Sequence, residues 1–336
     1  MEVSCIARWP PICVLNRMKM LHWAILAPLA AFAASSVAPI DPAAVNNPAQ
    51  QPLTMGAKGP GVIRAQILLA RAHFSTGEID GSFGSNMQKA LNAFQDARKL
   101  PTTESLDAAT WAVLNTDNAP PLIEYAITDQ DLQGPFTPVP PKIEDQAALP
   151  SLGYASVFEE LGEHFHCSPE LLKSLNPAAN FEQAGTKLQV PNVMVMPAGK
   201  AARVVVSKTE SAVRAYDASG ALLAFYAATI GSQHDPLPIG EWKINGVARD
   251  PKFHYNPKLF WDAKPKSDKA TIQAGPNNPV GLVWIDLSKS HYGIHGTPEP
   301  SKVGHAESHG CIRLTNWDAL ELASMVKPGT PATLKE

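Results

Sequence analysis

Apolar residues recur at helical spacing in the first third of the chain and at alternating positions in the last third. Two runs in the first third show apolar side chains three or four positions apart: Ile63, Ile67, Ala70 and Phe74, and then Met87, Leu91, Phe94 and Ala97. This spacing puts the apolar side chains of each run on one helix face. A shorter third helix is expected over residues 107–114, and Ser85 is expected to cap the second helix. The pattern predicts a small helical bundle over residues 53–116.

A second, shorter module is predicted over residues 151–194. Apolar spacing indicates one helix near residues 157–165. Ser168 is expected to cap a second helix, with Pro169 at its first position, where a missing N–H costs nothing. A strand is expected over residues 185–191.

From residue 202 onward the pattern has the two-residue period of strands. A helix capped by Thr315 is expected to run to Val326. The expected strands cover residues 203–207, 211–216, 221–230, 240–245, 281–287, 292–295 and 332–334. Residues 201–336 should therefore form a mainly β domain, a barrel or a sandwich, with one helix near its end.

Proline is unusually frequent, with 31 residues, and it is concentrated between the predicted elements. Residues 37–52 are expected to form a flexible stalk, and residues 118–150 a stiff linker. The chain is thus predicted to be multidomain, with small modules joined by proline-rich connectors.

The N-terminus has the pattern of an export signal. Arg17 and Lys19 precede an apolar run over residues 21–34, and small residues around Ala31 fit a cleavage site. The run is shorter than a membrane span needs, although a retained anchor is the alternative. We expect residues 1–36 to be a leader and the protein to act in the periplasm or cell wall. The net charge of −3 gives no general attraction for nucleic acid.

Cysteine usage directs attention to Cys311. Cys5 and Cys13 fall in the predicted leader, which leaves Cys167 and Cys311 in the mature protein. Two cysteines so far apart do not make a disulfide framework. In an oxidising compartment an unpaired cysteine is a liability unless its reactivity is used.

The surroundings of Cys311 suit a thiol nucleophile. A thiolate attacks carbonyl carbon when a nearby imidazole removes its proton. His295 is the candidate base and His309 a close neighbour, with backbone amides near Gly310 and Cys311 as donors to an oxyanion.

Zinc is the competing chemistry, because the histidines fall in two pairs with ligand-like spacing: His291 and His295, and His305 and His309. The segment around His295 has a strand pattern, however. Positions four apart in a strand lie about 13 Å from each other, which is too far for one ion. No metal is expected.

Two upstream motifs resemble known wall-binding modules. Residues 79–84 (Ile-Asp-Gly-Ser-Phe-Gly) and 93–95 (Ala-Phe-Gln) are similar to the loop and helix of the peptidoglycan-binding three-helix module. Residues 151–194 resemble a degenerate LysM module, a fold that binds N-acetylglucosamine chains. Residues 152–154 are Leu-Gly-Tyr where that family has Gly-Asp-Thr, so a spacer role and glycan binding both remain open.

The last domain resembles the L,D-transpeptidase catalytic domain of the YkuD type. The resemblance rests on His-Gly-Thr at residues 295–297 and on Ser-His-Gly-Cys-Ile-Arg-Leu-Thr-Asn-Trp-Asp at residues 308–318. Residues 235–242 also resemble a family segment, with Leu237 where threonine is usual. The resemblance implies a role in peptidoglycan biosynthesis, and thereby in cell wall biogenesis and cell shape.

The resemblance also implies roles for individual residues. Cys311 would be the nucleophile, His295 the general base, and the Gly296 carbonyl the group that orients the imidazole. His309 and Gly310 would shape the oxyanion region. Ser308 and Arg313 are weaker candidates for substrate binding, and for Arg313 a strand-end salt bridge is an equal alternative. No cofactor is implied.

The implied reaction releases D-alanine from a tetrapeptide stem and leaves a thioester on Cys311. The acceptor would be an amine of a neighbouring stem or a lipoprotein lysine, whereas water as acceptor would make an L,D-carboxypeptidase. A sortase-like transpeptidase fits the motif spacing poorly. A non-catalytic wall-binding protein remains a further alternative.

Overall fold

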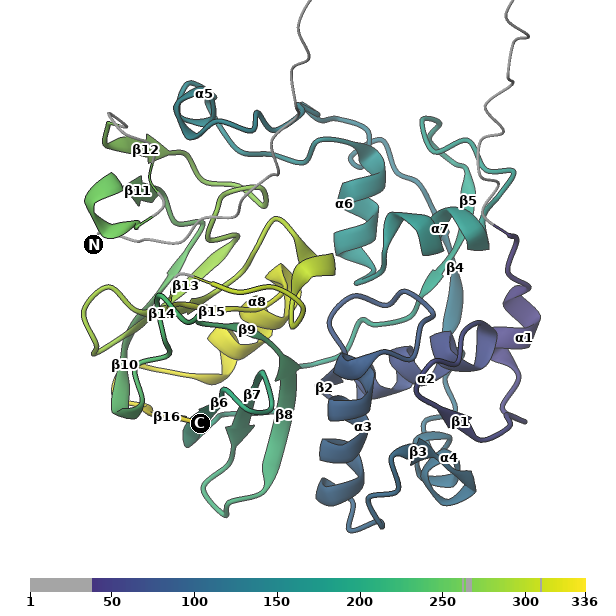
Figure 1. Cartoon of the computed structure of the whole chain (residues 1–336). Coiled ribbons are helices and arrows are strands. Elements are labelled where there is room, and N and C mark those ends of the chain that lie inside the picture. Colours follow the sequence, from purple (N-terminus) through teal and green to yellow (C-terminus); the bar gives the residue numbers. More distant parts are fainter. Residues whose placement is uncertain (1–37, 262, 264–267, 309) are drawn as a thin grey trace, which may run out of the picture.

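The computed structural model describes residues 38–261, 263, 268–308 and 310–336. The predicted leader and His309 therefore lie outside the described residues. Among the helices that are described, none is long and apolar enough to cross a membrane. The helical module, the second module and the C-terminal domain are packed against one another (Figure 1).

The first module has the three predicted helices, here α2, α3 and α4, and a short additional helix, α1. Val45 of α1 is completely buried, so the expected flexible stalk at residues 37–52 is wrong in this part. The expected cap at Ser85 is also wrong, because the helix begins at Ser85 itself and Gly84 takes the cap position. The elements are α1 (Pro42–Asn46), β1 (Leu53–Thr54), α2 (Pro60–Arg71), β2 (Phe74–Ser75), α3 (Ser85–Ala97), β3 (Ser105–Leu106) and α4 (Ala108–Leu114).

The second module takes its first strand from the predicted linker. Strand β4 (Leu122–Ala126) pairs antiparallel with β5 (Lys187–Pro191), and helices α6 (Val157–His164) and α7 (Pro169–Leu175) lie between them in sequence. The linker expected over residues 118–150 is therefore wrong at β4. Apolar side chains explain the difference, because Leu122 is buried in the same core as Leu188 and Val190. Ser168 caps α7 as predicted, and its hydroxyl accepts a hydrogen bond from the Leu171 amide.

The C-terminal domain is mainly β, as predicted. Within the described residues one continuous ten-stranded sheet runs in the order β2-β8-β7-β6-β16-β10-β13-β14-β15-β9. A separate hairpin pairs β11 with β12. Helix α8 (Asn316–Met325) is capped by Thr315, whose hydroxyl accepts from the Asp318 amide. The strands are β6 (Arg203–Ser207), β7 (Ala212–Tyr216), β8 (Leu222–Ala227), β9 (Thr229–Ile230), β10 (Gly240–Arg249), β11 (Phe253–Tyr255), β12 (Ala270–Ile272), β13 (Val283–Leu287), β14 (Gly293–His295), β15 (Ile312–Arg313) and β16 (Pro331–Lys335).

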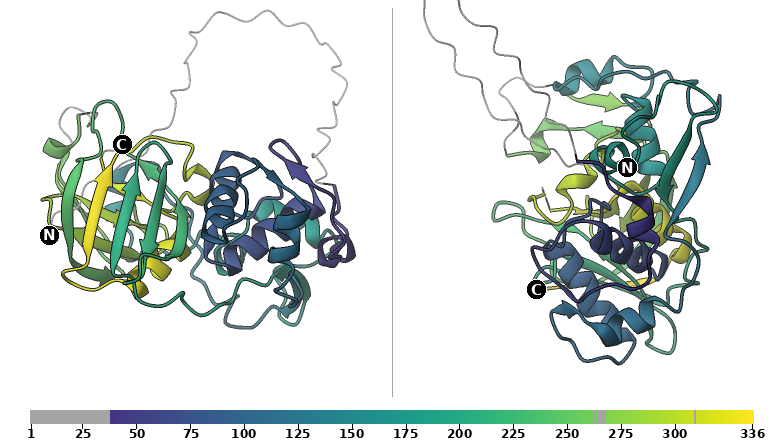
Figure 2. Two further views of the ribbon diagram at one scale, coloured as in Figure 1. Left: turned by 90° about the horizontal axis from the view of Figure 1, so that it is seen from below. Right: turned by 90° about the vertical axis from the view of Figure 1, so that its right-hand side faces the viewer.

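Strand β10 joins the two halves of this sheet. Its first residues pair with β16, and its later residues pair with β13 from Ile244 onward, with a register shift between Ile244 and Gly246. Such an irregularity bends a strand and increases its local twist. The two halves enclose a core that also includes the apolar face of α8. The left panel of Figure 2 shows β16, in yellow, among its green and teal neighbours.

The modules share hydrophobic cores. Ile63, Ile67 and Ile79 of the first module belong to the same buried cluster as Leu161 and Phe165 of the second. Burying apolar surface contributes about 25 cal/mol per Å², so these shared clusters stabilise the packing of the modules on one another. The proline-rich connectors therefore join parts that are already packed together.

The first module also extends the sheet of the C-terminal domain. Strand β2 pairs in parallel with β8, with Phe74 opposite Phe225. Both phenylalanines belong to the buried cluster that holds α3 and α4. The sheet edge at β8 is thus covered by residues more than 130 positions upstream in the chain.

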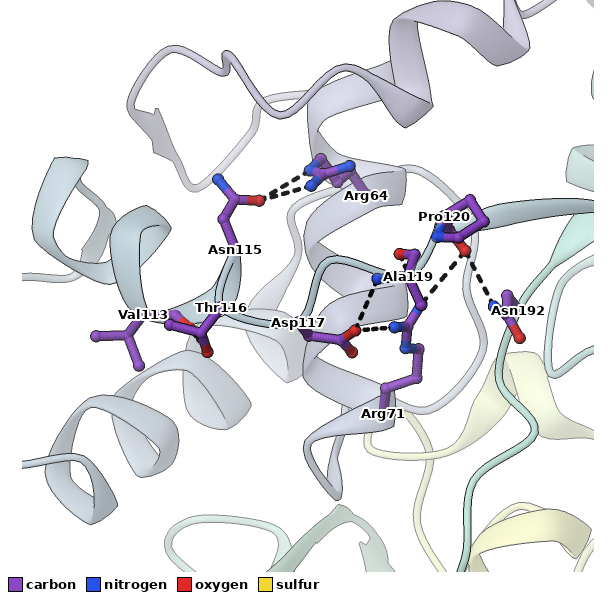
Figure 3. Close-up of polar contacts among 9 residues, drawn as sticks. All are labelled: Arg64, Arg71, Val113, Asn115, Thr116, Asp117, Ala119, Pro120 and Asn192. Atoms are coloured by element: carbon purple, nitrogen blue, oxygen red, sulfur yellow. Dashed lines mark hydrogen bonds and ion pairs between the residues drawn. The ribbon is translucent and has the colours of Figure 1, made fainter.

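Two buried arginines of α2 bind residues 115–120, which lead from the end of α4 toward β4 (Figure 3). Arg71 forms an ion pair with Asp117 and donates to the carbonyls of Ala119 and Pro120 at 3.2 and 3.3 Å. Arg64 donates twice to Asn115 Oδ1, at 3.2 and 2.6 Å. These bonds satisfy carbonyl groups that lie outside regular helices and strands. A buried polar group without a hydrogen-bond partner would lower the stability of the fold.

Candidate active site

Strands β14 and β15 lie side by side and place His295 and Arg313 on one face of the sheet. They pair in parallel, with Ile294 opposite Ile312 and His295 opposite Arg313. Side chains alternate along a strand, so the two isoleucines point into the main core while His295 and Arg313 share the other face. Cys311 immediately precedes β15 and packs in a second cluster with Trp284, away from that core.

His295 is fully buried and held in one orientation. Its Nδ1 lies 2.6 Å from the Gly296 carbonyl oxygen, and the Trp284 indole stacks on the ring with centroids 5.4 Å apart. A carbonyl can only accept, so Nδ1 carries the proton and Nε2 of the neutral ring carries the lone pair. Within the described residues Nε2 has no hydrogen-bond partner. A buried basic nitrogen left open in this way is typical of a reactive site.

The thiol of Cys311 lies beneath a cover of apolar side chains. Cys311 is 1% exposed, and its Sγ is 3.8 Å from the His291 carbonyl oxygen. The cover comes from the β11–β12 hairpin and from the segment before α6, and its buried members are Leu152, Phe253, Tyr255, Phe260 and Ile272. The cysteine is thus enclosed, as suits a nucleophile that must be kept from water.

Ser308 and Gly310 shape the chain just before the cysteine. The Ser308 hydroxyl donates to the Cys311 carbonyl at 2.6 Å, and the Ser308 amide donates to the Gly231 carbonyl at 3.0 Å. Gly310 has a φ of +92°, and a Cβ there would lie 2.8 Å from Tyr292 Cε1. Glycine is needed at this position for both reasons. His309, predicted to share the oxyanion region, falls outside the described residues.

Arg313 is buried on β15, with 8% of its surface exposed. Its register opposite His295 places the two residues on the same face of the sheet. The structure therefore brings together His295, Gly296, Gly310, Cys311 and Arg313, with Ser308 supporting the turn. No group of three or more His, Cys, Asp or Glu side chains within the described ranges is arranged to hold a metal ion.

Behind His295 lies an amide–carboxylate pair that the sequence did not predict. Asn316 Nδ2 donates to both oxygens of Glu163 on α6, at 2.8 and 3.0 Å. Burial raises the pKa of Glu163 to about 8, and the hydrogen bond from Asn316 opposes this shift. Asn316 lies within the motif at residues 308–318, but no local pattern connects it with a glutamate 153 positions upstream.

Comparison with known proteins identifies the families that two parts of the chain match. The family model described as "L,D-transpeptidase catalytic domain" matches residues 201–334, and the one described as "Putative peptidoglycan binding domain" matches residues 58–114. The chain is 33% identical to "Putative L,D-transpeptidase YkuD" of Bacillus licheniformis over 178 residues, which cover 52% of this chain and 92% of that protein.

Two further similarities extend the comparison. The chain is 28% identical to "Probable L,D-transpeptidase YbiS" of Escherichia coli K12 over 44% of its own length, and it spans about half of that relative, 49%. A solved L,D-transpeptidase from Xylanimonas cellulosilytica aligns with 86% of this chain and 99% of its own at 15% identity, with a TM-score of 0.37. On the match to the Bacillus licheniformis protein, the chain belongs to the L,D-transpeptidase family.

Proposed function

We propose that the chain is an exported enzyme that forms peptidoglycan cross-links through a thioester on Cys311. The observation that carries this proposal is the arrangement of His295. Its Nδ1 proton is committed to the Gly296 carbonyl, while its Nε2 is open on the face of the sheet that Cys311 adjoins. The imidazole is therefore prepared to accept a proton at Nε2 and at no other atom.

The proposed reaction has two halves. In the first, His295 Nε2 takes the thiol proton, and Cys311 Sγ attacks the carbonyl carbon of the third residue of a tetrapeptide stem. Backbone amides near Gly310 and Cys311 would stabilise the oxyanion. The peptide bond to D-alanine breaks, D-alanine leaves with the proton from His295, and a thioester remains.

In the second half an acceptor amine attacks the thioester. The amine loses a proton to His295, the carbon–sulfur bond breaks, and the sulfur recovers the proton as a thiol. The donor peptide bond supplies the energy of the new amide bond, so the cycle needs no cofactor. The acceptor would be an amine of a neighbouring stem or a lysine of a lipoprotein.

The burial of Cys311 limits the access of bulk water to a thioester at this position. A thioester beneath the apolar cover would be shielded from bulk water, which slows hydrolysis. The same enclosure must open for any acceptor, so the muropeptide experiment below decides between transpeptidation and the L,D-carboxypeptidase alternative. The first module and the LysM-like second module would hold the enzyme on the glycan.

Incubation with a purified tetrapeptide muropeptide, followed by mass analysis, tests this function. We expect a dimer whose mass equals two substrates minus one D-alanine. Tripeptide monomer without dimer would indicate the carboxypeptidase. Unchanged substrate, under conditions in which the protein is folded, would contradict the proposal.

A further inference from the structure

The first three residues of α8 each contact a different upstream residue. Asn316 bonds to Glu163, Trp317 stacks on His166 with centroids 4.9 Å apart, and Asp318 accepts from Ser75 Oγ at 2.8 Å. Glu163 and His166 belong to the second module, and Ser75 to the first. The start of the helix that follows the nucleophile is therefore built jointly by three parts of the chain.

Of these three contacts, the one at Asn316 is connected to His295 through Gly296. Asn316 is 1% exposed, and its Oδ1 accepts from the Leu282 amide at 3.1 Å. The same Oδ1 packs so closely on Gly296 and Gly281 that a Cβ on either glycine would collide with it. The Gly296 peptide, whose carbonyl holds the imidazole, therefore rests against the Asn316 amide.

Glu163 in turn fixes the Asn316 amide. With both carboxyl oxygens accepting from Nδ2, the amide group can only present Oδ1 toward Gly296 and Leu282. If the amide rotated by half a turn, Nδ2 would face the Leu282 amide, donor against donor. A second acceptor for Nδ2, the Pro276 carbonyl at 3.2 Å, is longer than either bond to Glu163.

We propose that Glu163 is a positioning residue for His295, acting through Asn316 and the Gly296 peptide. The proposal rests on the function proposed above, in which His295 is the base. It means that the second module contributes to acyl transfer in addition to any contact with glycan. Removing the carboxyl group would loosen the Gly296 carbonyl, and with it the direction of His295 Nε2.

The test compares Glu163→Leu and Glu163→Gln in the full chain. Glu163→Gln keeps an acceptor for Asn316 Nδ2 and should acylate at close to the wild-type rate. Glu163→Leu should lower the rate constant for carbapenem acylation about tenfold or more, because small misplacements of a catalytic group are costly. Glu160→Leu, on the same helix, is the matched control and should leave the rate unchanged.

A second readout separates positioning from a general structural role. The Nδ1 proton of His295, hydrogen-bonded at 2.6 Å, should give a downfield nuclear magnetic resonance signal. That signal should shift or broaden in Glu163→Leu and persist in Glu163→Gln. If Glu163→Leu does not fold, Glu163→Asp, which keeps the carboxyl group but shortens its reach, takes its place with the same expected direction.

Unchanged acylation in Glu163→Leu would overturn the proposal, as would slow acylation with an unchanged His295 signal. The nuclear magnetic resonance signal of His295 can be measured without catalytic turnover. A protein that forms no acyl adduct at all would refute the proposed function, while the His295 signal in the variants would still decide the role of Glu163.

Discussion

The side chains of Ser75 and Asp318 join the first module to the helix that follows the candidate nucleophile. Ser75 Oγ donates to Asp318 Oδ2 at 2.8 Å, and both residues are buried. The bond connects the end of β2 with the first turn of α8, 243 positions apart in sequence. Docking of the first module is therefore linked to the protonation of a buried carboxyl group.

Asp318 should make stability depend on pH. Burial raises its pKa to about 8, while hydrogen bonds from Ser75 and Thr315 oppose the shift. The folded state thus holds a proton that the unfolded state releases near pH 4, so the contribution of Asp318 to stability is complete below that pH and is lost as pH rises through about 8. In urea unfolding, Asp318→Asn should gain stability relative to wild type between pH 5 and 8. A constant difference across this range would contradict the raised pKa.

Arg71 should contribute to the stability of the first module. Arg71→Met removes the donor from Asp117 and from two backbone carbonyls (Figure 3), and the free energy of unfolding should fall by about 1–3 kcal/mol. Urea denaturation measures this, with Lys173→Met on the exposed side of α7 as the control, expected to change little. An Arg71→Met protein as stable as wild type would mean that water replaces these bonds without cost.

Gly310→Ala should damage the site more than the fold. Alanine at a φ of +92° costs about 1–2 kcal/mol, and its Cβ would also press on Tyr292. Gly220→Ala is the matched control, because its φ is +88° and a Cβ there meets nothing within 4 Å. Both variants should lose stability in thermal unfolding, and Gly310→Ala should lose at least as much as Gly220→Ala. Only Gly310→Ala should acylate slowly with a carbapenem, and equal rates in the two variants would refute a special role for Gly310.

His295→Ala should slow acylation by about 10²–10⁴, the contribution typical of a general base. Circular dichroism should show that the fold is retained. His305→Ala, in the exposed part of the segment between β14 and the nucleophile, is the control and should acylate at the wild-type rate. Undiminished acylation by His295→Ala would remove His295 from the role of base.

Local patterns predicted the elements whose signals are local. Thr315 and Ser168 cap their helices as expected, because a hydroxyl before an apolar run satisfies helix amides wherever the chain folds. Ser85 has the same chemistry, but the first turn starts one residue earlier than the pattern suggested, with Gly84 at the cap. The residue at which a helix begins depends on the backbone conformation before it. A capping motif does not specify that conformation.

The other errors concern segments whose structure depends on distant partners. Strand β4 is short and directly follows Pro120 and Pro121, and its partner β5 lies more than 60 positions away. Helix α1 likewise owes its place to Val45, which is buried in a core built from two modules. Neither pairing can be deduced from local periodicity, because composition alone made both segments resemble linkers.

The residues of the candidate site likewise fall into those that local patterns predicted and one that they missed. The motif around Cys311 and the glycines flanking His295 indicated both residues, and the pairing of β14 with β15 gives them a common face. Glu163 was missed because its partner Asn316 is reached only through the packing of the second module on α8. A contact between modules leaves no signal in the sequence of either one.

The most direct test of the account is the mass of the intact protein after incubation with a carbapenem. Cys167→Ala is the matched control, since Cys167 is also buried and burial raises the pKa of its thiol, which makes it a poor nucleophile. Wild type and Cys167→Ala should each gain the mass of one carbapenem, and Cys311→Ala should gain none. An adduct on Cys311→Ala, or its loss in a folded Cys167→Ala protein, would contradict the assignment of Cys311 as the nucleophile.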